Sequence, residues 1–166
     1  MRVLGLDPGI ERTGFAILES DRGEVFSLLE CGRILTNRRA PFSNRLMLIA
    51  EDVRKLIREF RPDAAALEQI FFSKNVKTAI NVSHARGVLL ELLEENGIPV
   101  QEFNPGSIKL AITGSGRADK IQMRKMIHLL LKRDIPHDDA LDAVACGLCF
   151  LQQICVSPPV SASSVR

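Results

Sequence analysis

The sequence lacks the features that mark several classes of protein. No stretch of its 166 residues approaches the roughly 20 consecutive apolar residues of a membrane span, so we expect no transmembrane helix and no membrane partner. The first residues read directly as a strand rather than as a secretory signal, and we therefore expect a cytoplasmic location. There is no internal repeat. A composition of 46% hydrophobic and 25% charged residues is ordinary for a single folded domain.

Cysteine is scarce and does not form the pattern of a zinc site. Cys146 and Cys149 make one Cys-x-x-Cys pair, but Cys31 and Cys155 do not supply the second pair that a four-ligand site needs. The pair lies in an apolar pattern with helical spacing. We therefore predict reduced thiols in the core rather than a redox or metal-binding group.

Hydrophobic periodicity and turn residues predict a mixed α/β fold. Three strands joined by hairpin turns are followed by alternating helices and strands, an order typical of a mixed five-stranded sheet with helices on both faces. We expect one domain over residues 1–153 and a disordered tail over 154–166. The expected strands are 2–7, 14–19, 25–36, 64–70 and 98–103, and the expected helices are 43–60, 75–96, 105–112, 120–132 and 138–153.

Single residues within these elements carry further expectations. Gly32 is a candidate β-bulge in the third strand. Ser43 is a candidate N-cap of the first helix. Asp119 is a second candidate N-cap, and Gln122 three residues later would complete a variant of the capping box.

Asp7 stands at the exit of the first buried strand. Pro8 has no N–H for a sheet ladder and Gly9 permits a turn, so the strand must end there. A carboxylate that is half removed from water needs a neutralising partner, and Mg²⁺ takes such oxygen ligands. The alternative is that Asp7 caps a turn, as aspartate often does in this context.

Glu68 lies inside a second apolar run, between Leu67 and Ile70, where a glutamate is unlike a solvated surface residue. If this strand pairs in parallel with the first, the two strands end at the same edge of the sheet. Glu68 and Asp7 would then lie close together.

The last predicted helix begins with three further acids, Asp138, Asp139 and Asp142. Asp142 shares a helix face with each of the other two. Acids in a first turn also suit the helix dipole, and this capping role fits Asp138 best. We interpret Asp139 and Asp142 as metal ligands. A cluster of these two with Asp7 and Glu68 would be neutralised by two divalent ions about 3.5–4 Å apart, which can hydrolyse a phosphodiester.

Two basic segments accompany the acids. Residues 71–90 contain Lys74, Lys77 and Arg86 with no acid, and residues 101–135 carry seven lysines or arginines against three acids. This distribution predicts a polyanionic partner. The alternative is two solvated helix faces.

Together these motifs closely resemble the RuvC family of bacterial Holliday-junction resolvases, within the ribonuclease H-like superfamily. The resemblance covers roughly residues 1–153 in the family's order and spacing. It is carried by Gly5-Leu-Asp-Pro-Gly9 with Thr13-Gly14, Leu67-Glu-Gln-Ile-Phe71 with Lys74-Asn75, Ala85-Arg-Gly87, Lys109 with Gly114-Ser-Gly116 and Lys120, and Asp139-Ala-Leu-Asp-Ala143.

The resemblance implies a ribonuclease H-like fold and a homodimer that nicks a four-way DNA junction symmetrically. It implies that Asp7, Glu68, Asp139 and Asp142 bind two Mg²⁺ per subunit, with Mn²⁺ as a substitute. Asp138 is an extra acid beside the motif, so Asp138 and Asp139 both remain candidates, and His137 could contact a phosphate or water. RuvA and RuvB, the branch-migration proteins, are implied as partners.

The resemblance also implies DNA-binding roles. An aromatic at Phe71 would stack on a base, although Phe72 offers a second candidate and either ring could be core. Lys109 and Lys120 would bind a phosphate or stabilise developing charge, which gives Lys120 a catalytic role as well. The DNA-binding set is Phe71, Lys74, Arg86, Lys109 and Lys120. The helix over 75–96 is expected to form the dimer interface.

Three other functions compete with this interpretation. The first loop is also similar to the phosphate loop of sugar kinases and actin-like ATPases, but those need a second such domain, for which 166 residues leave no room. A junction-binding module without catalysis would have no need of all four acids. A related nuclease could cut other nucleic acid, such as an RNA–DNA hybrid.

Overall fold

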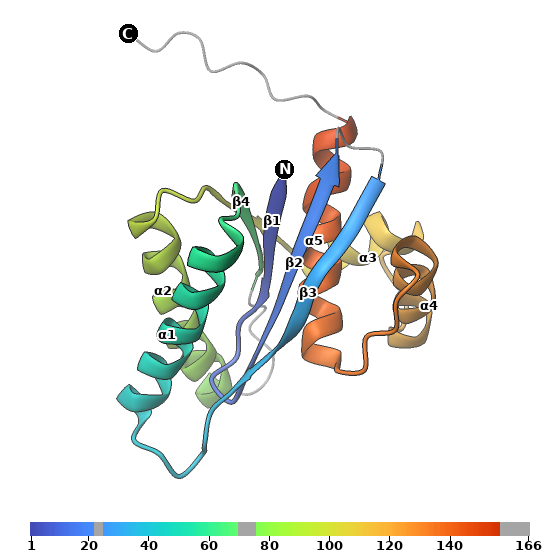
Figure 1. Cartoon of the computed structure of the whole chain (residues 1–166). Coiled ribbons are helices and arrows are strands. Elements are labelled where there is room, and N and C mark those ends of the chain that lie inside the picture. Colours follow the sequence, from blue (N-terminus) through green and yellow to red (C-terminus); the bar gives the residue numbers. More distant parts are fainter. Residues whose placement is uncertain (22–24, 70–75, 157–166) are drawn as a thin grey trace, which may run out of the picture.

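The computed structural model of the protein describes residues 1–21, 25–69 and 76–156. In these ranges the strands form one mixed sheet in the order β3-β2-β1-β4-β5, which confirms the predicted α/β fold (Figure 1). β2 pairs antiparallel with β1 and β3, while β4 pairs parallel with β1 and β5. The elements are β1 (Arg2–Asp7), β2 (Arg12–Asp21), β3 (Val25–Leu35), α1 (Phe42–Phe60), β4 (Ala64–Glu68), α2 (Val76–Glu95), β5 (Val100–Phe103), α3 (Pro105–Thr113), α4 (Lys120–Leu131) and α5 (Asp138–Val156).

Helices cover both faces of the sheet, as expected. In Figure 1, α1 and α2 lie on one side, and α5 lies on the other with α3 and α4 beyond it. Alternate residues of each strand point to opposite faces, so Leu4 and Leu6 join the core under α1 and α2 while Val3 joins the core under α5. The central strands β1 and β4 are therefore apolar on both sides, apart from Arg2 at the start of β1 and the acid that ends each strand.

Two glycines allow α5 to pack directly on the sheet. A Cβ atom at Gly5 would lie 2.1 Å from the carbonyl oxygen of Ala143, and one at Gly14 would lie 1.9 Å from the carbonyl oxygen of Asp139. Any side chain at these positions would push the helix outward. Gly5 and Gly14 thus bring the first turns of α5 against the end of β1.

The expected bulge at Gly32 is wrong. The β2–β3 register shifts between Ile17 and Leu18, where Leu29 is the extra residue on β3. Gly32 instead pairs with Phe15, and a Cβ there would lie 2.9 Å from the Phe15 ring. The glycine makes room for an aromatic ring on the neighbouring strand rather than for a kink.

The two predicted helix caps had different outcomes. The prediction for Ser43 is wrong, because α1 begins at Phe42 with Pro41 at the N-cap position and no side-chain cap. The capping box of α4 is confirmed: Asp119 accepts from the backbone N–H of Gln122, and the Gln122 side chain accepts from the backbone N–H of Asp119.

The C-terminal helix is longer than expected and carries the predicted core thiols. α5 continues to Val156, three residues beyond the expected boundary, and the remainder of the predicted tail lies outside the described residues. Cys146 and Cys149, both on α5, are buried in the core between this helix and the sheet, as predicted. No helix in the described part of the chain is both long and apolar enough to cross a membrane.

Candidate active site

Asp7 and Glu68 leave the sheet side by side, as predicted. β1 and β4 are parallel with Leu6 opposite Leu67, so the next residue of each strand emerges at the same edge. The two carboxyl groups are joined by a hydrogen bond. The buried strands that precede them fix both backbones, and the acids therefore meet at a rigid edge.

The two acids of α5, Asp139 and Asp142, both affect the pKa of Asp7. Burial, followed by the charges of Glu68, Asp142 and Asp139 in that order, raises the pKa of Asp7 to about 8 against the opposing charge of Lys120. All four predicted acids therefore belong to one electrostatic cluster. The close packing of α5 at Gly5 and Gly14 is what brings the two helix acids there.

Burial and nearby negative charge also raise the pKa values of Glu68 and Asp142. Burial and then Asp142 raise the pKa of Glu68 to about 7, against the opposing effects of Lys120, the hydrogen bond with Asp7, and Lys109. Burial also raises the pKa of Asp142, which its hydrogen bond to Lys120 counteracts. A cluster with raised carboxyl pKa values holds more negative charge than its surroundings compensate, which is the condition under which it binds cations.

Two basic side chains form ion pairs with the acids of α5. Lys120 Nζ donates to Asp142 Oδ2 at 2.6 Å, and Arg12 Nε lies 3.5 Å from Asp139 Oδ2. Among the described residues, no three His, Cys, Asp or Glu side chains converge closely enough to hold one metal ion. The buried carboxylate oxygens nevertheless are donors of the kind that Mg²⁺ takes, so the set fits a divalent ion if Lys120 and Arg12 release their partners.

Asp138 and Asp139 differ clearly in their surroundings. The Asp138 carboxylate accepts a hydrogen bond from Arg124 at 2.7 Å, and its side chain is 64% exposed. The Asp139 side chain is only 21% exposed and acts on Asp7. His137 starts the helix by accepting the N–H of Leu141 on its carbonyl oxygen. The geometry thus favours Asp139 over Asp138 as the member of the cluster.

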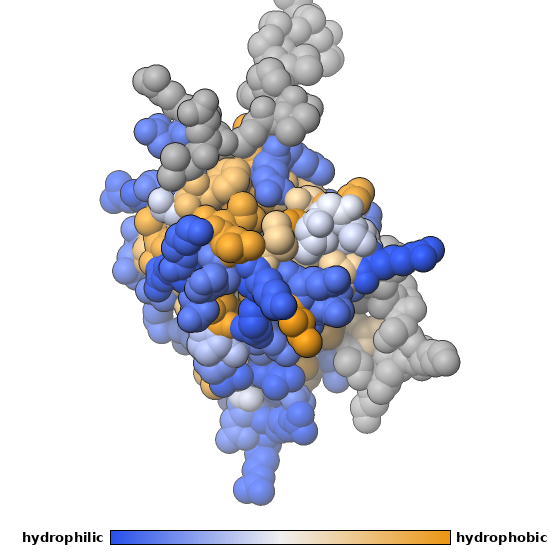
Figure 2. All heavy atoms as spheres, turned by 90° about the vertical axis from the view of Figure 1, so that its right-hand side faces the viewer, coloured by the Kyte–Doolittle hydropathy of each residue, from blue (hydrophilic) through white to orange (hydrophobic). Residues whose placement is uncertain are grey.

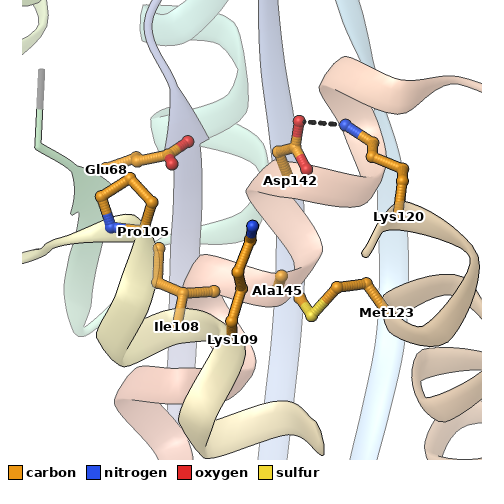
Figure 3. A pocket seen from close by; sticks show the side chains of 8 residues that line it. All are labelled: Glu68, Pro105, Ile108, Lys109, Lys120, Met123, Asp142 and Ala145. Carbon is orange, nitrogen blue, oxygen red and sulfur yellow. Dashed lines mark hydrogen bonds and ion pairs between the residues drawn. The ribbon is translucent and has the colours of Figure 1, made fainter. Parts of the chain in front are cut away.

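Lys109 and Lys120 reach the cluster from α3 and α4. They line a cavity of about 200 Å³ with Glu68 and Asp142, and Figure 3 shows Lys109 rising between these two acids. On the side of α3 and α4, hydrophilic side chains dominate the lower half of the face, and apolar side chains gather in its upper half (Figure 2). This side of the acids is open to a charged partner.

Of the other predicted DNA-binding residues, only Arg86 lies in the described part of the chain, and it is not at the acids. Arg86, on α2, forms an ion pair with Glu102 of β5. It lines neither the cavity beside Glu68 and Asp142 nor a second cavity beside Asp7 and Asp139. Phe71, Phe72 and Lys74 lie outside the described residues.

Sequence reasoning missed Arg12 and Arg38. Both line a second cavity, of about 390 Å³, that contains Asp7 and Asp139. The nearby Asp-Pro-Gly motif was the available signal for Arg12, but its partner Asp139 lies far along the chain. Arg38 follows the third strand in a turn that has no motif of its own.

The chain is similar to known nucleases over most of its length. The family described as "Crossover junction endodeoxyribonuclease RuvC" matches residues 3–150. The protein of that name from Petrotoga mobilis is 44% identical over 151 residues, which are 90% of this chain and 92% of that protein. The structure titled "T. thermophilus RuvC in complex with Holliday junction substrate" superposes with a TM-score of 0.86 at 28% identity, covering 92% of this chain and 96% of that one.

A more distant structure shares the fold alone. The yeast mitochondrial Holliday junction resolvase superposes with a TM-score of 0.68 at 14% identity, covering 93% of this chain and 83% of that one.

Proposed function

Because the chain belongs to the RuvC family of crossover junction endodeoxyribonucleases, we propose that it resolves Holliday junctions by paired, symmetric nicking of DNA strands during recombination and repair. The observation that carries the proposal is the coupling of Asp7, Glu68, Asp139 and Asp142 in one cluster. Four acids from two strands and one helix, partly removed from water, have no structural purpose that an apolar residue would not serve better.

The family implies a divalent metal cofactor, and we assign four ligands to it. The proposed ligands are Asp7, Glu68, Asp139 and Asp142, with two Mg²⁺ per subunit and Mn²⁺ as a substitute. When bound, the ions supply a water of lowered pKa and stabilise the leaving oxygen of the phosphodiester. The raised pKa of Asp7 and Glu68 supports this assignment, because both carboxylates need a cation to stay ionised near neutral pH.

Lys109 and Lys120 complete the proposed catalytic site. Both ammonium groups line the cavity beside Glu68 and Asp142, at the edge of the acids. We assign them to binding the DNA phosphate, and Lys120 also to stabilising the negative charge that develops during cleavage. The hydrogen bond from Lys120 to Asp142 holds its ammonium in place before the substrate binds.

Further DNA contacts are proposed at Phe71, Lys74 and Arg86, by family resemblance. Phe71 would stack on a base, with Phe72 as the alternative. For Arg86, its ion pair with Glu102 would have to be shared with or exchanged for a phosphate.

The assembly is proposed on the same basis. A two-fold homodimer suits a junction with two-fold symmetry. α2 remains the proposed interface, since Ile80 is half exposed, although Val88 and Leu90 pack partly against the core. RuvA and RuvB are the proposed partners, and a cytoplasmic location follows from acting on DNA with them.

The test compares three labelled substrates: a four-way DNA junction, a linear duplex of matched sequence, and an RNA–DNA hybrid. Each is incubated with the protein in Mg²⁺ and in chelator. The proposal predicts paired symmetric nicks in the junction only, and only with Mg²⁺. Binding of the junction without nicks in any divalent metal would refute catalysis, and cleavage of the hybrid would refute the proposed substrate.

A further inference from the structure

The four acids face two cavities, one on each side of the cluster. Glu68 and Asp142 line the cavity that contains Lys109 and Lys120. Asp7 and Asp139 line the second cavity, which contains Arg12 and Arg38. Each cavity therefore carries two of the acids and two basic side chains. The proposed function gives the lysine pair a role but leaves the arginine pair without one.

Two of the walls of the second cavity are turns held by hydrogen bonds. The turn between β1 and β2 forms one side, and it is tied down by Thr13 Oγ1, which donates to the Gly9 carbonyl at 2.6 Å, and by Thr36 Oγ1, which donates to the Ile10 carbonyl at 2.5 Å. A turn after β3, closed by the Ala40 N–H on the Asn37 carbonyl, carries Arg38. Residues on rigid walls can position a ligand with little further loss of entropy.

Both arginines can take an additional anion. Arg12 contacts Asp139 through Nε, and Arg38 pairs with Glu11 through one terminal nitrogen. A guanidinium carries five N–H donors, so each retains donors beyond its ion pair. Their side chains are 57% and 78% exposed, which leaves both within reach of a bound strand. Arginine is the residue that best matches the geometry of a phosphate.

We propose that Arg12 and Arg38 bind a DNA phosphate next to the scissile one, on the opposite side of the acids from Lys109 and Lys120. The cleaved strand then crosses the N-terminal end of α5 between a lysine pair and an arginine pair, with the acids in the middle. This inference rests on the proposed function and adds a subsite to the same site. Three acids, Asp7, Glu11 and Asp139, share the cavity with the two arginines, so phosphate binding there is strongest when a divalent cation neutralises the cluster.

The experiment is a phosphate scan combined with mutation. Junctions are made with a single neutral methylphosphonate at successive positions around the cleavage site, and their affinity is measured by fluorescence anisotropy in Ca²⁺. The variants are R38Q, R12Q and R12Q/R38Q. The matched controls are R39Q, next to Arg38 but outside the cavity, and R58Q, on α1. R38Q is the most direct variant, because Arg38 pairs with Glu11 rather than with one of the four acids. Thermal unfolding of each variant verifies the fold.

The proposal predicts one position, adjacent to the scissile phosphate, at which the methylphosphonate weakens binding by the wild type and by both controls but no longer by R12Q/R38Q. It also predicts that the double variant loses one phosphate contact in the salt dependence, so that its Kd changes about three- to fourfold less between 50 and 200 mM salt. The R38Q variant alone should show part of both effects.

The proposal would be overturned if, at every position, the methylphosphonate weakened binding by R12Q/R38Q as much as it weakens binding by the wild type. It would also be overturned if R39Q or R58Q lost the same phosphate contact as R12Q/R38Q. These outcomes are distinct from failure of the proposed function, which would appear as a wild type that does not prefer or cleave the junction.

Discussion

Removing divalent metal should make the stability of this protein fall as the pH rises through neutrality. Asp7 and Glu68 are crowded with like charge, and their pKa values are raised from 3.8 to about 8 and from 4.5 to about 7. Without a cation, ionising them costs free energy in the folded state but not in the unfolded chain. Asp7→Asn removes the central charge of the cluster and should relieve this cost.

The sign and size of this change in the free energy of unfolding follow from proton linkage. Between an unfolded pKa near 4 and a folded pKa of about 8, the folded protein binds more protons than the unfolded chain, so raising the pH lowers the free energy of unfolding. One extra proton changes that free energy by about 1.4 kcal/mol per pH unit, or about 3 kcal/mol between pH 5 and 7. This is the contribution of Asp7 alone. The pKa of Glu68 is raised to about 7, so Glu68 adds to the loss over the same range.

The assay is urea unfolding in chelator from pH 5 to 8.5. The wild type should lose at least about 3 kcal/mol between pH 5 and 7. Asp7→Asn should lose clearly less and should be the more stable protein at pH 8. Glu51→Gln, an exposed acid on α1, is the control and should behave as the wild type. Adding Mg²⁺ should stabilise the wild type more at pH 8 than at pH 5.5. Parallel pH profiles for the wild type and Asp7→Asn would refute the reasoning.

Three further predictions concern the construction of the site. Gly5→Ala should destabilise the fold by about 1–3 kcal/mol and reduce cleavage, because it pushes α5 away; Gly87→Ala, where a Cβ meets nothing within 4 Å, should be neutral or stabilising in the same urea titration. Asp139→Asn should reduce the cleavage rate more than Asp138→Asn, and the reverse order would reassign the ligand. Lys120→Met should lower the single-turnover cleavage rate roughly a hundredfold at saturating enzyme, and an unchanged rate would exclude it from catalysis.

Much of this architecture is predictable from local patterns. Strand alternation and turn residues predict β1 and β4, and parallel pairing then brings Asp7 and Glu68 to one edge. Helical spacing puts Asp139 and Asp142 near one another. These predictions succeed because each depends on the period of one element and on a single assumption about pairing.

Apart from the start of α1, the failures and omissions involve contacts between distant segments. Nothing near Gly32 in the sequence shows that the Phe15 ring covers it, so the glycine was expected to mark a bulge. The ion pair between Arg12 and Asp139 depends on how closely α5 approaches β2, which Gly14 determines. The length of a helix, the partner of a basic side chain and the wall of a cavity are set by tertiary packing rather than by local propensity.

The central claim is that the acid cluster is a catalytic centre rather than a structural one. The most direct test measures binding and nicking of the same labelled four-way junction by the wild type and by Asp7→Asn in Mg²⁺. The account predicts paired symmetric nicks from the wild type, and from Asp7→Asn comparable binding with no nicks, since the variant keeps the basic residues and loses one proposed metal ligand. Nicking by Asp7→Asn at the wild-type rate would contradict the account.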